Sequence, residues 1–291
     1  MSVEVSNTLS ASVDPLAGTT APNGKPIWTA DEIADYLNRS ETGWLGLPNH
    51  ALQSDANNQE ITFGFHTSLA TLQANGYVFV YMGRGYGQPE YFNFAPFSAA
   101  QRSAAREAMD AWDDVIAVDL TEATDINAAD IAFGNLASAP TTQAYAYLPS
   151  SYIYYYNIHE VNLQLSDLAG DVWVSLSQAS NLRLDEGQYG LKSLVHEIGH
   201  SLGLSHPGDY NAAPGVLITY GPDAEYYQDN RAYTTMSYFD ASDIGINHFD
   251  FHISGVTHAS TPLIHDILAA QKIYGADTTT RTGDTTYGFN S

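Results

Sequence analysis

The stretch HEIGHSLGLSH, which begins at His196, contains three histidines, one glutamate and two glycines. His196 and His200 are four residues apart, so on a helix their side chains share one face and can bind one ion. Glu197 is adjacent to the first histidine, where its carboxylate can act as general base on a water at the same ion. Gly203 can adopt the left-handed conformation that ends the helix and returns His206 as a third ligand. Three protein ligands leave a coordination position for water or substrate, which is typical of catalytic zinc sites.

The alternative is an ordinary buried helix that happens to carry imidazoles. Its apolar residues would pack in any protein, and they are Leu194, Val195, Ile198 and Leu202. A short HExxH match arises by chance in about one protein in a hundred. Requiring Gly203 and His206 at fixed offsets lowers that rate by about three orders of magnitude. The pattern therefore favours a metal site on a helix whose apolar positions still belong to the core.

A methionine and a tyrosine, Met236 and Tyr238, lie further along the chain in the segment TMSY. The histidine motif followed by TMSY resembles the metzincin metallopeptidases, in which a tight methionine turn lies beneath the metal. Other stretches are similar to the serralysin branch of bacterial secreted proteases: PGDYN after the third histidine, TQAYAYLP at 142–149, PLIHDILAAQKIYGA at 262–276 and TTRTGDTTYGFNS at 279–291. The resemblance covers the chain from about residue 25 to its end.

The resemblance implies a role for each residue of the motif. The three histidines would hold zinc, and Glu197 would be the general base. Tyr238 matches the tyrosine that ligates the resting zinc and swings away to stabilise the oxyanion, while Met236 supports the floor of the histidines. This agrees with the chemistry of the residues, since a tyrosine hydroxyl can donate to the charge that develops on the scissile carbonyl.

The segment Gln143, Ala144, Tyr145, Ala146 and Tyr147 resembles the edge strand on which an extended peptide lies antiparallel in this family. Backbone hydrogen bonds of that kind bind many sequences, so broad protein and peptide substrates are expected. Ordinary sheet packing is the alternative for these tyrosines. The expected activity is that of a zinc-dependent endopeptidase, and the alternative is a catalytically inactive, zinc-stabilised protein-binding module.

The resemblance implies an α/β metzincin fold with a twisted, mostly parallel sheet, an active-site helix and a mostly irregular C-terminal subdomain with one helix. The expected organisation is a flexible leader or propeptide at 1–25, a catalytic domain at 26–278 and the start of a truncated calcium-binding repeat domain at 279–291. Periodicity, capping residues and β-branched runs predict helices at 28–37, 98–116, 191–204 and 262–275, and strands at 60–66, 77–82, 129–136, 161–165 and 171–176.

Calcium is a second cofactor that the resemblance raises. Arg281, Gly283 and Thr285 match family positions that donate oxygens to the first calcium ion of the repeats. The partner ligands would come from repeats that follow in the family, whereas this sequence stops at Ser291. Zinc is therefore the expected cofactor, and calcium is a weaker expectation.

Charge and composition restrict the partners. The chain has 10 Lys and Arg against 33 Asp and Glu, a net charge of −23, which argues against nucleic acid and anionic membranes. Cysteine is absent, so a disulfide framework, thiolate ligands and a cysteine nucleophile are excluded. No apolar run is long enough to span a membrane, and no secretory signal is visible at the N-terminus. The resemblance implies a secreted, extracellular monomer exported without an N-terminal signal peptide, with a proteinaceous inhibitor as a further partner.

Four other histidines, His248, His252, His258 and His265, lie in the C-terminal part. The first two, in HFDFH, raise the alternative of a second metal site, but histidines and aspartates in a polar loop need no ligand. For His265, beside Asp266, we expect a position on the helix surface.

Overall fold

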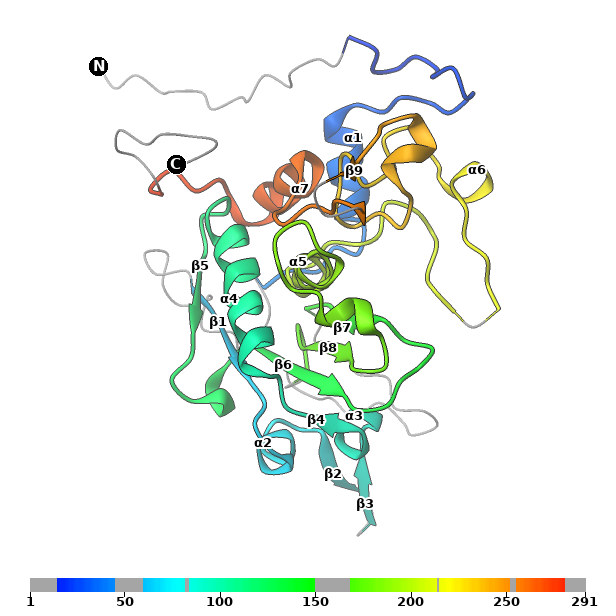
Figure 1. Ribbon diagram of the computed structural model, residues 1–291. Helices are drawn as coiled ribbons and strands as arrows, with labels where there is room; N and C mark the ends of the chain where they lie inside the picture. The colour runs from blue at the N-terminus through cyan, green and yellow to red at the C-terminus, as the bar shows by residue number, and fades with distance from the viewer. Residues whose placement is uncertain are drawn as a thin grey trace, which may run out of the picture.

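The computed structural model describes residues 15–44, 60–81, 84–149, 168–213, 215–251 and 255–280 (Figure 1). Its centre is a mixed sheet in which β5, β1, β6, β8 and β7 follow one another and β4 pairs with β6. The first four of these strands run parallel, while β7 and β4 are antiparallel to their neighbours. The strands are β1 (Glu60–Phe65), β4 (Phe94–Ala95), β5 (Asp119–Glu122), β6 (Ile131–Leu136), β7 (Ala144–Ala146) and β8 (Val172–Ser175). The expected α/β class with a mostly parallel sheet is confirmed.

Two long helices, α4 (Ala99–Asp113) and α5 (Tyr189–Ser201), lie side by side against this sheet (Figure 1). Ser98 caps α4 through a capping box with Gln101, as its position before the apolar periodicity predicts. Trp112 is fully buried between the two helices and donates its indole N–H to the carbonyl of Val195 at 3.1 Å. Almost every residue of α5 is buried, so the helix that carries the histidines is also part of the core.

A second pair of helices lies near the C-terminal end of α5, where the Tyr274 hydroxyl donates to the carbonyl of Leu202. Helix α1 (Ala30–Leu37), capped by Thr29, packs against α7 (Ile264–Tyr274), although the two are far apart in sequence. Lys272 on α7 forms ion pairs with Asp31 and Asp35 on α1, and α7 ends at Gly275 with φ 82°. Both helices agree with their predicted ranges.

The remaining elements are short. Before α4 they are α2 (Leu69–Ala74), β2 (Val78–Tyr81), β3 (Arg84–Gly87) and α3 (Pro89–Phe92), and later η2 (Ile126–Ala128) and η3 (Ala179–Leu182). After α5 they are α6 (Tyr220–Asp223), η4 (Ala241–Ile244), β9 (Phe249–Asp250) and β10 (Gly255–Val256). The C-terminal part is thus mostly irregular, but it holds the one-turn α6 and a small hairpin besides α7, which corrects the expectation of one helix. The strand predicted at 161–165 lies outside the described residues.

The chain is already folded before residue 25, the boundary expected for the leader. Gly18 and Ile27 are joined by a backbone hydrogen bond, and Thr20 and Pro26 form an isolated bridge. The Lys25 ammonium donates to the carbonyl of Gly221 at 3.0 Å, which attaches this turn to α6. These contacts order residues 15–25, although their composition predicts flexibility. Among the described residues, no helix is long and apolar enough to cross a membrane.

Candidate metal centre

Helix α5 ends where the sequence predicts, at a tight turn centred on Gly203. This glycine has φ 103°, in the left-handed region that residues with a Cβ rarely adopt. A Cβ there would also overlap the carbonyl oxygen of Thr42. The turn lies beneath residues 40–44, because Ser40 donates to the Gly203 carbonyl at 3.0 Å and the Trp44 indole donates to Ser201 at 2.8 Å. The chain therefore reverses directly after the helix and returns His206 to it.

The reversal brings three imidazoles together. The ligand atoms of His196, His200 and His206 all lie within 4.8 Å of one another, and this is the one such group of metal-binding side chains among the described residues. Nε2 of His206 is 3.1 Å from Nε2 of His200 and 3.3 Å from Nε2 of His196. A tetrahedral zinc ion with Zn–N bonds of about 2.05 Å would separate its nitrogens by about 3.3 Å. The two separations from His206 therefore fit a zinc ion.

The hydrogen bonds of the opposite ring nitrogens identify the tautomers. Nδ1 of His196, His200 and His206 donates to the carbonyls of Thr235, Leu204 and Tyr210, at 2.7, 2.7 and 3.1 Å. A carbonyl only accepts, so each Nδ1 carries the proton and each neutral ring presents the lone pair of Nε2. Three lone pairs that face one another repel unless a cation lies between them. The site thus requires a metal ion or a proton, and the three carbonyls hold each imidazole in the tautomer that can bind a metal.

Burial also keeps these rings neutral. Desolvation lowers the pKa of His200 to about 4 and that of His206 to about 2, and it places the pKa of His196 well below its usual value. Neutral imidazoles at pH 7 can bind a metal without first losing a proton.

Glu197 lies beside the histidines with its carboxyl group buried. Desolvation raises its pKa to about 8, against a smaller lowering by the charge of Lys192. Like the three histidines, Glu197 lines a cleft of about 880 Å³ that opens between α5, the edge strand β7 and the loop that follows His206. A buried carboxyl group that faces a cleft can accept a proton there and hold it.

Tyr238 and Met236 lie on either side of the histidines. The ring of Tyr238 is in the cleft wall, with its centroid 4.5 Å from that of His206, and burial raises the pKa of its hydroxyl to about 12. Met236 is fully buried on the other side of α5, where its Sδ would lie 2.6 Å from a Cβ at Gly199. The methionine therefore packs against the helix between His196 and His200, away from the cleft.

Curated relatives share this sequence over most of its length. The chain is 38% identical to the metalloprotease AprA of Pseudomonas entomophila over 271 residues, 92% of this chain and 49% of that protein. It is 42% identical to the serralysin of Proteus mirabilis over 210 residues (67% and 38%) and 35% identical to serralysin G of Dickeya chrysanthemi over 277 residues (92% and 49%). The chain belongs to the serralysin-type metalloproteases. It spans about half the length, or less, of these relatives, and no family model matches it. Membership implies a metal cofactor, for which the three histidines are suited.

In this serralysin-type chain the predicted substrate strand is the edge of the sheet. β7 pairs only with β8 among the described strands. Gln143 and Tyr147 form backbone hydrogen bonds toward the β8 side, with Ser175 and Asp171. Because these bonds alternate along an antiparallel pair, the backbone groups of Ala144 and Ala146 point away from β8, toward the free edge. The cleft is lined by this edge, which leaves room for an extended peptide.

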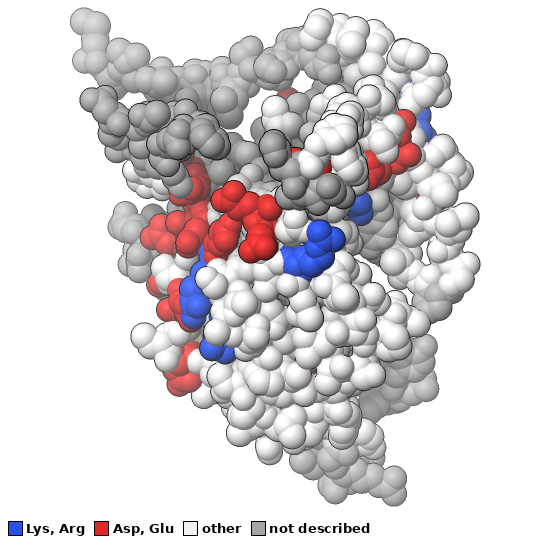
Figure 2. Space-filling view, in the orientation of Figure 1, with Lys and Arg blue, Asp and Glu red and all other residues white. Residues whose placement is uncertain are grey.

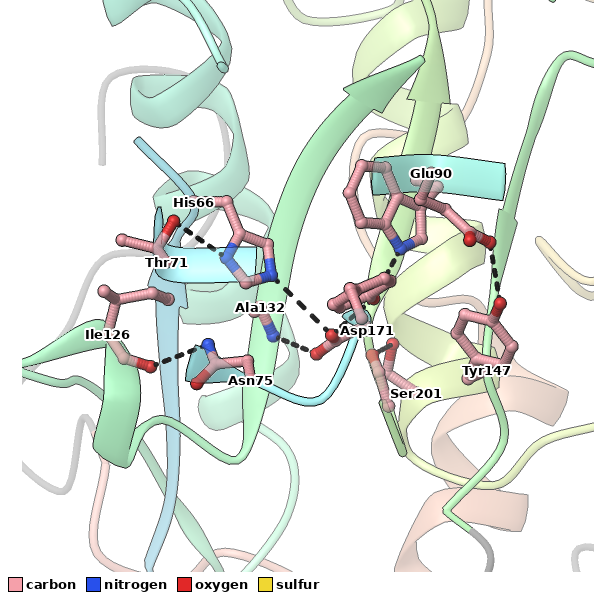
Figure 3. Close-up of polar contacts among 12 residues, drawn as sticks. His66, Thr71, Asn75, Glu90, Ile126, Ala132, Tyr147, Asp171 and Ser201 are labelled. Atoms are coloured by element: carbon pink, nitrogen blue, oxygen red, sulfur yellow. Dashed lines mark hydrogen bonds and ion pairs between the residues drawn. The ribbon is translucent and has the colours of Figure 1, made fainter. Parts of the chain in front are cut away.

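The sequence did not predict a buried carboxylate that binds the tyrosine side chains of β7 and of the residue that follows it. Glu90, on α3, is 2% exposed and accepts a hydrogen bond from the hydroxyl of Tyr147 at 2.7 Å (Figure 3). It accepts another from the hydroxyl of Tyr145 at 2.5 Å. Sheet packing, the alternative considered for these tyrosines, therefore describes their side chains. Their backbones remain available to the cleft.

A second buried acid fastens β8 to the centre of the sheet. Asp171 accepts from the backbone N–H of Ala132 at 2.6 Å and from the hydroxyl of Tyr77 at 2.7 Å, and Nε2 of His66 lies 3.8 Å away (Figure 3). Its own carbonyl accepts from the N–H of Tyr147. The hydrogen bonds of Asp171 within the core thus fix the position of the edge strand β7.

Two further acids support the carbonyls that hold the histidines. Asp266 accepts from the N–H of Thr235 at 2.7 Å, from its hydroxyl at 3.0 Å, and from the hydroxyl of Thr234 at 2.5 Å. Asp229 accepts from the hydroxyl of Tyr210 at 2.8 Å and from that of Ser237 at 2.7 Å. An acidic residue in the first turn of a predicted helix, as Asp266 is, was the available signal for such a role.

None of the other C-terminal histidines that the structure describes joins the metal centre. Nε2 of His248 contacts Asp240 at 2.5 Å, and His258 packs edge-on against Tyr189. His265 is 6% exposed and stacks on Tyr233, so the expectation of a helix-surface position is wrong, because this face of α7 packs onto the segment before Met236. His252 and the predicted calcium residues Arg281, Gly283 and Thr285 lie outside the described residues.

Proposed function

We propose that this chain is a zinc-dependent endopeptidase with a metzincin fold, which hydrolyses peptide bonds of proteins with broad specificity. The observation that carries the proposal is the convergence of three proton-free Nε2 atoms beside a buried glutamate on an open cleft. Three neutral imidazoles suit zinc and leave a coordination position for catalysis. The unpaired edge of β7 supports an extended peptide as substrate, because backbone pairing accepts many sequences.

The mechanism assigns the proton transfers to Glu197 and a hydrogen bond to Tyr238. Bound zinc would polarise the scissile carbonyl and make water a stronger acid. An oxygen of the Glu197 carboxylate accepts the proton of the attacking water and later donates it to the nitrogen of the leaving amine. The Tyr238 hydroxyl, protonated at neutral pH, donates a hydrogen bond to the oxygen of the carbonyl as negative charge develops there. Met236 supports the histidine helix and transfers nothing.

Chelation tests the proposed function. We expect the zinc-loaded protein to contain about one zinc per chain and to cleave casein, and we expect a chelator to abolish cleavage until zinc is restored. Elemental analysis and a casein assay on the same sample measure both. Zinc at full occupancy without hydrolysis would instead support the inactive binding module.

Replacing Tyr238 by phenylalanine should lower kcat by about 10²-fold and leave KM almost unchanged, since the hydroxyl acts on the transition state. Zinc content should stay at the wild-type value because the three imidazoles remain. Tyr36→Phe removes a surface hydroxyl that bonds Glu225 and does not line the cleft, and it is the matched control. Equal kcat values for Tyr238→Phe and the control would refute the role of the hydroxyl.

We also propose that the protein acts outside the cell on protein substrates, as a monomer, and that a proteinaceous inhibitor can fill the cleft. Calcium binding at Arg281, Gly283 and Thr285 belongs to the same group of proposals. The family resemblance of the sequence supports them.

A further inference from the structure

One basic residue of the cleft has no role in the mechanism above. Lys192 lies on α5, one helical turn before His196, and lines the same cleft as Glu197. Its side chain is 4% exposed. Four residues of helix correspond to about 6 Å, so this side chain begins close to the reacting centre.

The ammonium group of Lys192 has no partner among the residues that the structure describes. Among the described residues, no carboxylate lies within ion-pair distance of Nζ and none forms a hydrogen bond with it, while the centroid of the Tyr189 ring is 5.8 Å from Nζ. Lysines this deeply buried are almost always paired, because burying an unpaired charge is costly. A lysine that lacks a partner and faces a cleft is therefore suited to bind an anionic group of a ligand that enters the cleft.

A second cationic side chain, that of Arg231, lines the same cleft. Its guanidinium donates only through Nε, to the carbonyl of Ser237 at 3.2 Å, so the terminal nitrogens have no partner among the described residues. Desolvation, with a further contribution from the charge of Arg231, lowers the pKa of Lys192 to about 7, so the two cations are close enough to interact. An approaching carboxylate would reverse this effect, since opposite charge favours the ammonium form.

These cations contrast with the rest of the chain. Acidic residues outnumber basic ones by 33 to 10, and Figure 2 shows acidic side chains gathered over α4 and β5. The two acidic side chains whose charges act on Lys192, Glu197 and Asp266, have other roles. Glu197 faces the metal centre, and Asp266 accepts hydrogen bonds from Thr234 and Thr235. The cleft therefore holds a local positive region in an acidic protein.

We propose that Lys192 and Arg231 form a subsite that binds a carboxylate of the peptide substrate next to the scissile bond. The inference rests on the proposed peptidase function and adds a preference to it. The carboxylate belongs either to an acidic side chain or to the carboxyl terminus of the peptide. Paired with the two cations, it offsets the desolvation of both, so acidic substrates gain in kcat/KM over neutral ones.

Fluorogenic peptides that differ at one position test the subsite. Each position within three residues of the cleavage site carries Gln, Glu, Asn or Asp in turn, and every peptide is made with a free and with an amidated carboxyl terminus. We expect the zinc-loaded wild-type protein to prefer an acid over its amide by at least about tenfold at one position. A preference confined to free termini would assign the subsite to the terminal carboxylate.

The variants Lys192→Met and Lys192→Arg decide the origin of the preference. The readout is the ratio of kcat/KM for the acidic and the amide peptide on one enzyme, so a loss of active protein cancels. We expect the ratio to fall toward one in Lys192→Met and to persist in Lys192→Arg. Lys272→Met, which removes a surface lysine paired with Asp31 and Asp35, should keep the wild-type ratio.

Two results overturn the subsite: a wild-type ratio near one at every position, or a preference that survives in Lys192→Met. Failure of the proposed function looks different, since the zinc-loaded wild-type protein would then cleave none of the peptides.

Discussion

Glu197→Gln should lower kcat for peptide hydrolysis by about 10³-fold while the protein keeps its zinc and its fold. The amide has the size of the carboxyl group but cannot accept the proton of the attacking water or return it to the leaving amine. None of the three Nε2 atoms depends on this side chain, so metal content should equal that of the wild type. Peptide hydrolysis and elemental analysis on one preparation measure the two quantities.

Thermal unfolding adds an independent check on the same variant. Desolvation raises the pKa of Glu197 to about 8, which means that its charged form is disfavoured where it lies. A neutral amide avoids that cost, so the melting temperature should not fall. The exposed Glu186 lies just before α5, and Glu186→Gln is the matched control for a change of charge near the cleft. Normal casein cleavage by Glu197→Gln would contradict the proposed mechanism.

Gly203→Ala should cause the largest loss of stability among single methyl additions near the site. Its φ of 103° and the overlap with the Thr42 carbonyl oxygen act together, and we expect a cost of about 3 kcal/mol or more. Zinc affinity should fall at least tenfold, because the turn positions both the Leu204 carbonyl that holds His200 and the return of His206. Urea unfolding and a zinc titration measure these effects.

Substitutions at two other glycines separate the effect of backbone strain from that of the overlap with Thr42. Gly245 has φ 85° with no atom near its Cβ position, so Gly245→Ala tests backbone strain alone, at about 1 kcal/mol. Gly221 lacks both features, and Gly221→Ala should be nearly neutral. If Gly203→Ala were no worse than Gly245→Ala, the close approach of Thr42 would have no energetic role.

Local sequence rules predicted the elements that carry the site. Thr29 and Ser98 cap their helices through capping boxes, and the strands at β1, β6 and β8 lie within their predicted ranges. Each of these signals depends on residues a few positions apart, so it can be recognised in the sequence without knowledge of the fold. The contacts of residues 15–25 could not be predicted in this way, because Lys25 reaches Gly221, some two hundred residues further along the chain.

The supporting side chains could not be predicted in the same way. Glu90 is charged within a polar stretch, and only its burial behind Tyr145 and Tyr147 gives it a role. His265 lies on a helix that the pattern identifies, but the face it occupies depends on what packs against that helix. Burial and partner identity are long-range properties, and a single sequence does not contain them.

By itself, the sequence determined that His196 and His200 share a helix face, that the helix stops at Gly203, and that His206 returns. These follow from helical period and from the conformational freedom of glycine. Tertiary structure alone decided which carbonyls hold the imidazole protons and which acids anchor those carbonyls. It also decided that Lys192 faces the cleft with no partner in the described part of the chain. The reason is that these contacts join segments far apart in the chain, and only the folded core brings them within hydrogen-bond distance.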